Sequence, residues 1–136
     1  MQNEDCRMQN RNSPLHPCDL RERTKAFALR VIRMAQALPK SRVGAVVGGQ
    51  VLRSGTSVGA NYRAACRARS QAEFISKMHV VLEEADESRY WMELLVEAHL
   101  MPQQRLEGLM KEADELVAIT VASINTARKT QKAARK

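Results

Sequence analysis

The sequence predicts an all-α protein, an antiparallel up-and-down four-helix bundle, and three observations lead to this prediction. Of its 136 residues, 44% are hydrophobic but only 4% are aromatic, a composition that favours helices with an aliphatic core. Apolar residues recur at three- and four-residue steps in four segments, whereas no segment alternates like a strand. Only brief connections separate the segments, so neighbouring helices are expected to be antiparallel.

The first predicted helix begins near Asp19, whose side chain can cap it together with Glu22, three positions later. Pro39 ends the pattern. The apolar stripe between these points consists of Leu20, Phe27, Val31, Met34 and Leu38.

The second segment, about residues 43–69, contains "RSGTSVGANYRAACRARS" at 53–70 and resembles a glycine-rich loop at first sight. It lacks the spacing of a phosphate-binding loop. Placed on a helix, Val47, Val51, Ser54, Val58 and Ala65 face the core, and Gly44, Gly48, Gly55 and Gly59 form a stripe beside them that also holds Cys66. Four such glycines cost roughly 3 to 4 kcal/mol in helix propensity. We therefore expect a neighbouring backbone to approach closely there.

The third and fourth helices have the clearest boundaries. Ser70 and Glu73 form a capping box, and Pro102 stands where a first turn tolerates proline. The third helix carries the apolar stripe Phe74, Met78, Val81, Ala85, Ser88, Met92, Leu95 and His99, which predicts a core position for His99. The fourth carries Leu106, Leu109, Ala113, Leu116, Thr120 and Ile124.

The domain organisation follows from these segments: an irregular leader at 1–18, the bundle at 19–127, and an unfolded basic tail at 128–136. No run reaches the roughly 18 to 20 apolar residues of a membrane span, and the polar start lacks a secretory signal. We expect a cytoplasmic protein that does not engage membranes. Cys6, Cys18 and Cys66 are predicted to be free thiols.

The net charge of +7 is unevenly distributed along the chain. Residues 23–72 hold ten basic and no acidic residues, residues 73–115 hold four basic and eleven acidic residues, and residues 116–136 hold five basic and no acidic residues. A basic surface attracts nucleic-acid phosphates, but oppositely charged neighbouring helices also pair within a fold. We favour internal pairing for residues 23–115 and leave the nucleic-acid interpretation open for the tail.

Two groups of basic residues are candidates for binding nucleic acid. One group shares an edge of the second helix, and the other lies in the tail. The first consists of Arg42, Arg53, Arg63 and Arg67, and the second of Arg128, Lys129, Lys132, Arg135 and Lys136. Arg53, Arg63 and Arg67 could instead pair with Glu84 and Glu87 of the third helix, and the two uses could divide the arginines.

Three further residues are candidates for helix packing or an interface. Trp91 lies among carboxylates beside the apolar stripe, which suits either an interface anchor or the edge of the core. Asn61 and Tyr62 border the core face of the second helix, and a structural hydrogen bond is the favoured role of Asn61.

No pattern favours catalysis. His16, His79 and His99 lie far apart without metal-binding spacing, and no histidine neighbours the serines of the second helix. We therefore expect no enzymatic activity, no cofactor, no metal and no small-molecule substrate.

Residues 49–95, "GQVLRSGTSVGANYRAACRARSQAEFISKMHVVLEEADESRYWMELL", resemble the signature of the four-helix bundle proteins encoded in intervening sequences of bacterial 23S ribosomal RNA genes. The flanks "FALRVIRMAQALP" and "LEGLMKEADELVAITVASI" extend the resemblance over 19–124. One departure is Ala64, where relatives usually have an acid after N-Y-x, so an ion pair that relatives form there is in doubt.

The resemblance implies a small bundle that assembles into a ring, with homopentamers known among relatives. It also implies nucleic-acid binding, which a related branch carries out as the accessory protein of diversity-generating retroelements. The function expected is therefore a homo-oligomeric binding or scaffolding protein for structured RNA or DNA. The alternative is a structural oligomer that contacts only proteins.

Overall fold

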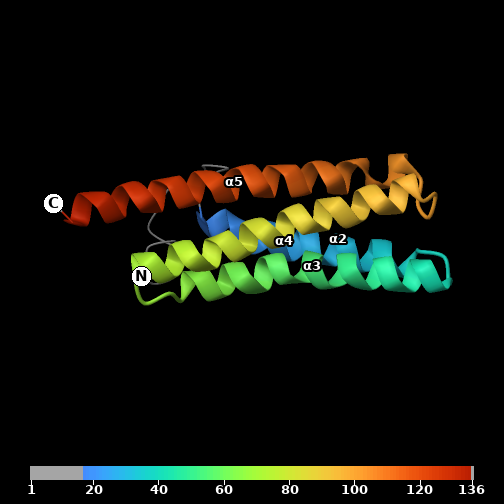
Figure 1. Ribbon diagram of the computed structural model, residues 1–136, viewed down its shortest axis with the longest axis horizontal. Coiled ribbons are helices and arrows are strands. Elements are labelled where there is room, and N and C mark those ends of the chain that lie inside the picture. Colours follow the sequence, from blue (N-terminus) through green and yellow to red (C-terminus); the bar gives the residue numbers. More distant parts are fainter. Residues whose placement is uncertain (1–16, 136) are drawn as a thin grey trace.

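The computed structural model describes residues 17–135, which form four helices: α2 (Pro17–Gln36), α3 (Arg42–Cys66), α4 (Gln71–Glu97) and α5 (Gln103–Arg135). Successive helices run in opposite directions, so the α2–α3 and α4–α5 loops lie at the same end of the bundle (Figure 1). The main packing contacts join α2 to α3, α3 to α4, α4 to α5 and α5 to α2, which leaves α3 and α5 diagonally opposed. The predicted antiparallel four-helix bundle is confirmed.

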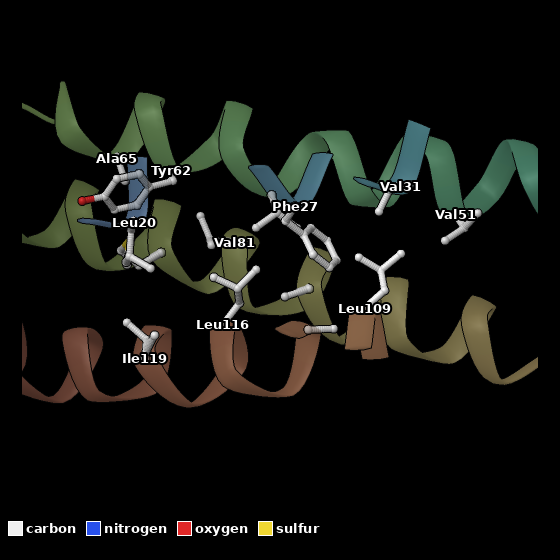
Figure 2. Packing of buried hydrophobic residues seen from close by; sticks show 14 of the residues in the cluster. Leu20, Phe27, Val31, Val51, Tyr62, Ala65, Val81, Leu109, Leu116 and Ile119 are labelled. Atoms are coloured by element: carbon white, nitrogen blue, oxygen red, sulfur yellow. The ribbon is translucent and has the colours of Figure 1, made fainter. Parts of the chain in front are cut away.

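A continuous apolar core fills the space between the helices (Figure 2). The stripes predicted from the sequence supply most of it, including Phe27, Val58, Met78 and Leu116, all fully buried. Tyr62 is also fully buried, although the sequence placed it at the border of the core face. The one aromatic ring of α3 therefore fills the interior and does not lie on the helix surface.

The glycine stripe of α3 faces α2. A Cβ added to Gly55 would lie 2.8 Å from both γ carbons of Val31, a separation that real Cβ atoms do not tolerate without movement. The remaining stripe glycines meet α2 or the loop after it: Gly44 would meet the Pro39 carbonyl oxygen at 2.6 Å, Gly48 would meet Leu38 Cδ1 at 2.8 Å, and Gly59 would meet Thr24 Oγ1 at 3.1 Å. The glycines thus allow the close helix approach that the sequence predicted.

Two small polar residues, Ser54 and Ser88, contact each other where α3 packs against α4. Ser54 and Ser88 are both fully buried, and the Ser88 hydroxyl lies 3.0 Å from Ser54 Oγ, within hydrogen-bonding distance. Ser54 also donates to the Gln50 carbonyl oxygen at 3.0 Å, so its hydroxyl is satisfied inside the core.

Most helix boundaries agree with the capping signals. Ser70 caps α4 as predicted, with its hydroxyl accepting from the Glu73 N–H at 3.0 Å, and Ser41 caps α3 in the same way. The first helix was expected to start near Asp19, and α2 begins two residues earlier, at Pro17. A first helical turn tolerates proline, since the missing N–H has no intrahelical partner there. The rest of the predicted leader, with Cys6 and His16, lies outside the described residues, as does the Cys18 side chain.

The expected core position of His99 is wrong. His99 is exposed and has a φ of 60°, so it follows the end of α4 instead of continuing its stripe. The Leu100 N–H donates to the Leu95 carbonyl oxygen at 2.9 Å, and the His99 N–H donates to that of Val96 at 3.0 Å. This pair of bonds is the Schellman arrangement, which turns the chain toward α5 and rotates His99 out of register.

Most of the segment expected to be an unfolded tail, residues 128–136, belongs to α5. α5 continues to Arg135, and Ala127 at the predicted boundary is buried. The segment that begins at Ala127, "ARKTQKAARK", consists largely of Ala, Arg, Lys and Gln. These residues are strong helix formers, so the helix extends past the bundle. In Figure 1 this end of α5 projects beyond the other three helices.

Candidate nucleic-acid interface

The outer surface of α3 and its C-cap carry arginines that pair with no carboxylate of the described residues. Arg42, Arg63 and Arg67 are exposed, and no ion pair within residues 17–135 involves any of them. Because α3 itself contains no acidic residue, their positive charge is not balanced along the helix. These three guanidinium groups are therefore available to phosphates in solvent, and we call them the α3 arginines.

Arg53 behaves differently, because it is held by α4. Its Nη1 lies 3.1 Å from Glu84 Oε2, and its Nη2 contacts Glu87 Oε2. The Trp91 indole N–H donates to the same Glu87 oxygen at 3.0 Å. Internal pairing therefore accounts for Arg53, Glu84 and Glu87, whereas nucleic-acid binding by Arg63 and Arg67 stays a prediction.

Asn61 makes a structural hydrogen bond. Its Nδ2 donates to the Ser57 carbonyl oxygen one turn earlier in α3 at 2.9 Å, and the side chain is half-buried. This bond occupies one donor of the amide within the helix, in line with the favoured structural role.

Apolar side chains are exposed on the first half of α3 and on the second half of α4, two helices that pack against each other. Val43 and Val46 are 55% and 62% exposed, and Tyr90 is 52% exposed. The half-buried Trp91 ring lies against Tyr90, with ring centroids 5.0 Å apart in an edge-to-face arrangement. We call Val43, Val46, Tyr90 and Trp91 the α3–α4 apolar patch. Patches of this kind at exposed aromatic residues are typical of protein interfaces. The sequence pointed to Trp91 alone.

The basic residues near the end of α5 form a separate surface. Arg128, Lys129 and Lys132 are exposed, and Arg128 Nη2 lies 3.0 Å from His79 Nε2 on α4. The side chain of Arg135 and the whole of Lys136 lie outside the described residues. Because α5 is diagonal to α3, the structure does not join these residues to the α3 arginines within one chain.

The fold also brings together basic residues to which no sequence pattern pointed. Arg30 and Arg33 of α2 and Arg105 of α5 line a single open pocket. More than 70 positions separate Arg33 from Arg105 along the chain, so no local motif could have identified the group.

Two further observations concern membrane spans and metal sites in the described helices. No helix within residues 17–135 is long and apolar enough to cross a membrane. In the same part of the chain, no three His, Cys, Asp or Glu side chains come together as a metal site would require.

Comparisons with known proteins agree with this architecture. The family model described as "23S rRNA-intervening sequence protein" matches residues 18–122. The solved structures include the crystal structure of a protein with unknown function from the S23 ribosomal protein family of Bacteroides thetaiotaomicron. Its sequence is 32% identical to that of this chain, and the two structures superpose with a TM-score of 0.76. The match covers 80% of this chain and 97% of the other. No curated protein matches the chain. Because the family model matches more than half of its residues, the chain belongs to the 23S rRNA-intervening sequence protein family.

Proposed function

We propose that this protein is a non-enzymatic, homo-oligomeric scaffold that binds structured RNA or DNA through its basic surfaces. The observation that carries the proposal is the set of exposed α3 arginines, which have no acidic partner in the described chain. Guanidinium groups bind phosphate oxygens in a bidentate manner, so Arg63 and Arg67 at one end of α3 and Arg42 at the other suit contacts with a nucleic-acid backbone. The family description, which refers to 23S rRNA, supports RNA as the partner.

Self-association is the second part of the proposal. The α3–α4 apolar patch lies on the same pair of helices as the α3 arginines, so joining copies through it would repeat the arginines around an assembly. The resemblance noted from the sequence implies five copies in a ring. Repetition turns several weak phosphate contacts into a useful affinity. Arg128, Lys129 and Lys132 at the projecting end of α5 add a second basic surface on each copy.

We expect the intact chain to bind a structured RNA with little sequence preference, because few exposed aromatic side chains are available to stack on bases. The affinity should fall steeply with salt, with log Kobs declining by about 0.9 per phosphate contacted on a duplex for each unit of log salt. A binding titration at four salt concentrations measures this slope.

The same titration separates the two functions weighed for this chain. Absence of RNA and DNA binding at low salt would contradict the proposal and favour a structural oligomer that contacts only proteins. A salt-independent affinity would also contradict it, since phosphate contacts release counterions. Replacing Lys129 and Lys132 by glutamine should reduce the slope if the end of α5 takes part.

A further inference from the structure

An open pocket of about 260 Å³ lies between the second half of α2 and the first turns of α5. It is near the end of the bundle that carries the α2–α3 and α4–α5 loops (Figure 1). Its lining divides into three cationic and three apolar side chains. These are Arg30, Arg33 and Arg105, and Met34, Met101 and Leu109. The pocket is separate from the α3 arginines, so a ligand there does not depend on the function proposed above.

The three arginines of the pocket form no ion pair with the described residues. All three are exposed. On α5, Glu112 and Glu115 lie toward α2, but both are engaged by Arg23, at 2.6 and 3.9 Å from its Nη2. The pocket therefore keeps an uncompensated positive charge, which favours an anionic ligand.

A glycine on α5 makes room for one of these arginines. A Cβ added to Gly108 would lie 3.2 Å from Arg30 Nη2, so the guanidinium rests directly over the backbone of α5. A Cβ at this position would require the group to shift by a few tenths of an ångström. The fold thus holds Arg30 toward Arg105, which stands one turn before Gly108 on the same helix.

The base of the pocket is apolar. Met101 and Leu109 are almost fully buried, and Met34 is half-buried against the core. Of the three, Met34 is the side chain that solvent reaches, and a bare phosphate ion would leave it in water, whereas a ligand with an apolar body beside its phosphate would cover it. Methionine is flexible and polarizable and packs favourably against aromatic rings, which suits a nucleobase.

We propose that this pocket binds a nucleotide: Arg30, Arg33 and Arg105 hold the phosphate group, and Met34, supported from below by the buried Met101 and Leu109, packs against the base or the ribose. The guanidinium forks provide charge-assisted hydrogen bonds to phosphate oxygens. The phosphate comes either from a free mononucleotide or from the 5′ end of an RNA chain.

The test is isothermal titration of the full-length protein with adenosine 5′-monophosphate, adenosine and inorganic phosphate. We expect the monophosphate to bind at least about tenfold more tightly than either of the others, because only it meets both halves of the pocket. Equal affinities for adenosine and the monophosphate would overturn the assignment of the arginines. Equal affinities for inorganic phosphate and the monophosphate would overturn the assignment of the apolar base.

Two double variants test whether the monophosphate binds in this pocket. Arg33→Gln combined with Arg105→Gln is expected to weaken binding of the monophosphate by about tenfold or more, since each charge-assisted bond is strong. The matched control is Lys25→Gln combined with Lys111→Gln, which removes two exposed charges from the same helices without touching the pocket. Equal losses in the two double variants would overturn the proposal. Thermal melts followed by circular dichroism verify that both variants are folded.

A final pair of titrations identifies the source of the phosphate. A short single-stranded RNA with a 5′-phosphate is compared with the same RNA bearing a 5′-hydroxyl. Tighter binding of the phosphorylated RNA, lost with Arg33→Gln and Arg105→Gln, supports an RNA end as the ligand. Equal binding of the two RNAs, with the monophosphate still bound, supports a free nucleotide.

Discussion

Replacing Gly55 with leucine is expected to lower the free energy of unfolding by about 1 to 3 kcal/mol or more, the range found for overpacked cores. Even a Cβ at this position would lie 2.8 Å from both γ carbons of Val31. Val31 is fully buried, so it cannot move aside without displacing other core residues. Urea denaturation, with the slope of the transition fitted for each variant, measures the change.

Two alanine variants of α3 provide the matched control. Gly49 is exposed, and a Cβ there would meet nothing within 4 Å, so Gly49→Ala should stabilise the protein by about 0.5 to 1 kcal/mol through helix propensity. Gly55→Ala gains the same helix propensity, but its Cβ forces α2 and α3 apart. We therefore expect this variant to be less stable than the unmodified protein. An equal gain in both variants would show that the stripe does not set the helix spacing.

Replacing Val46 with aspartate is expected to break the native assembly into monomers. Val46 is 62% exposed in the single chain, so a charge there leaves the folded subunit unstrained. In an assembly joined through the α3–α4 apolar patch, the same charge would be buried without a partner. We expect the association constant to fall about a hundredfold or more, which corresponds to about 3 kcal/mol.

Sedimentation at micromolar concentration measures the mass. The unmodified chain should sediment at several times the 15.3 kDa of one copy, and at five times if the ring is a pentamer. Val121→Asp is the control, because Val121 is 39% exposed on α5, the helix diagonal to α3. A monomeric unmodified chain, or equal masses for the two variants, would contradict self-association through the patch.

The parts of the fold that the sequence predicted depend on local periodicity. The glycines of α3 recur at helical spacing beside an apolar stripe, so both their shared face and their close approach to a neighbour followed from the sequence. The capping box at Ser70 is equally local, since donor and acceptor lie three residues apart. Features of this kind do not require knowledge of how the helices pack.

The errors and omissions arose where local rules compete or where distant segments meet. His99 continued the spacing of α4, but the left-handed turn after Glu97 removed it from the stripe. The pocket at Arg30 and Arg105 exists only because antiparallel packing brings α2 beside the start of α5. Charge alone also could not show that Arg53 would be paired while Arg63 would not, because both lie on one helical edge.

The most direct test of the account compares two charge-reversed proteins in a titration with structured RNA at low salt. Arg63→Glu with Arg67→Glu reverses two of the α3 arginines, and Lys25→Glu with Lys111→Glu makes the same change in net charge on α2 and α5. If the α3 arginines contact phosphates, the first protein should lose at least about tenfold more affinity than the second while remaining folded by circular dichroism. Equal losses in the two proteins would contradict the account, because net charge and not the surface of α3 would then determine the binding.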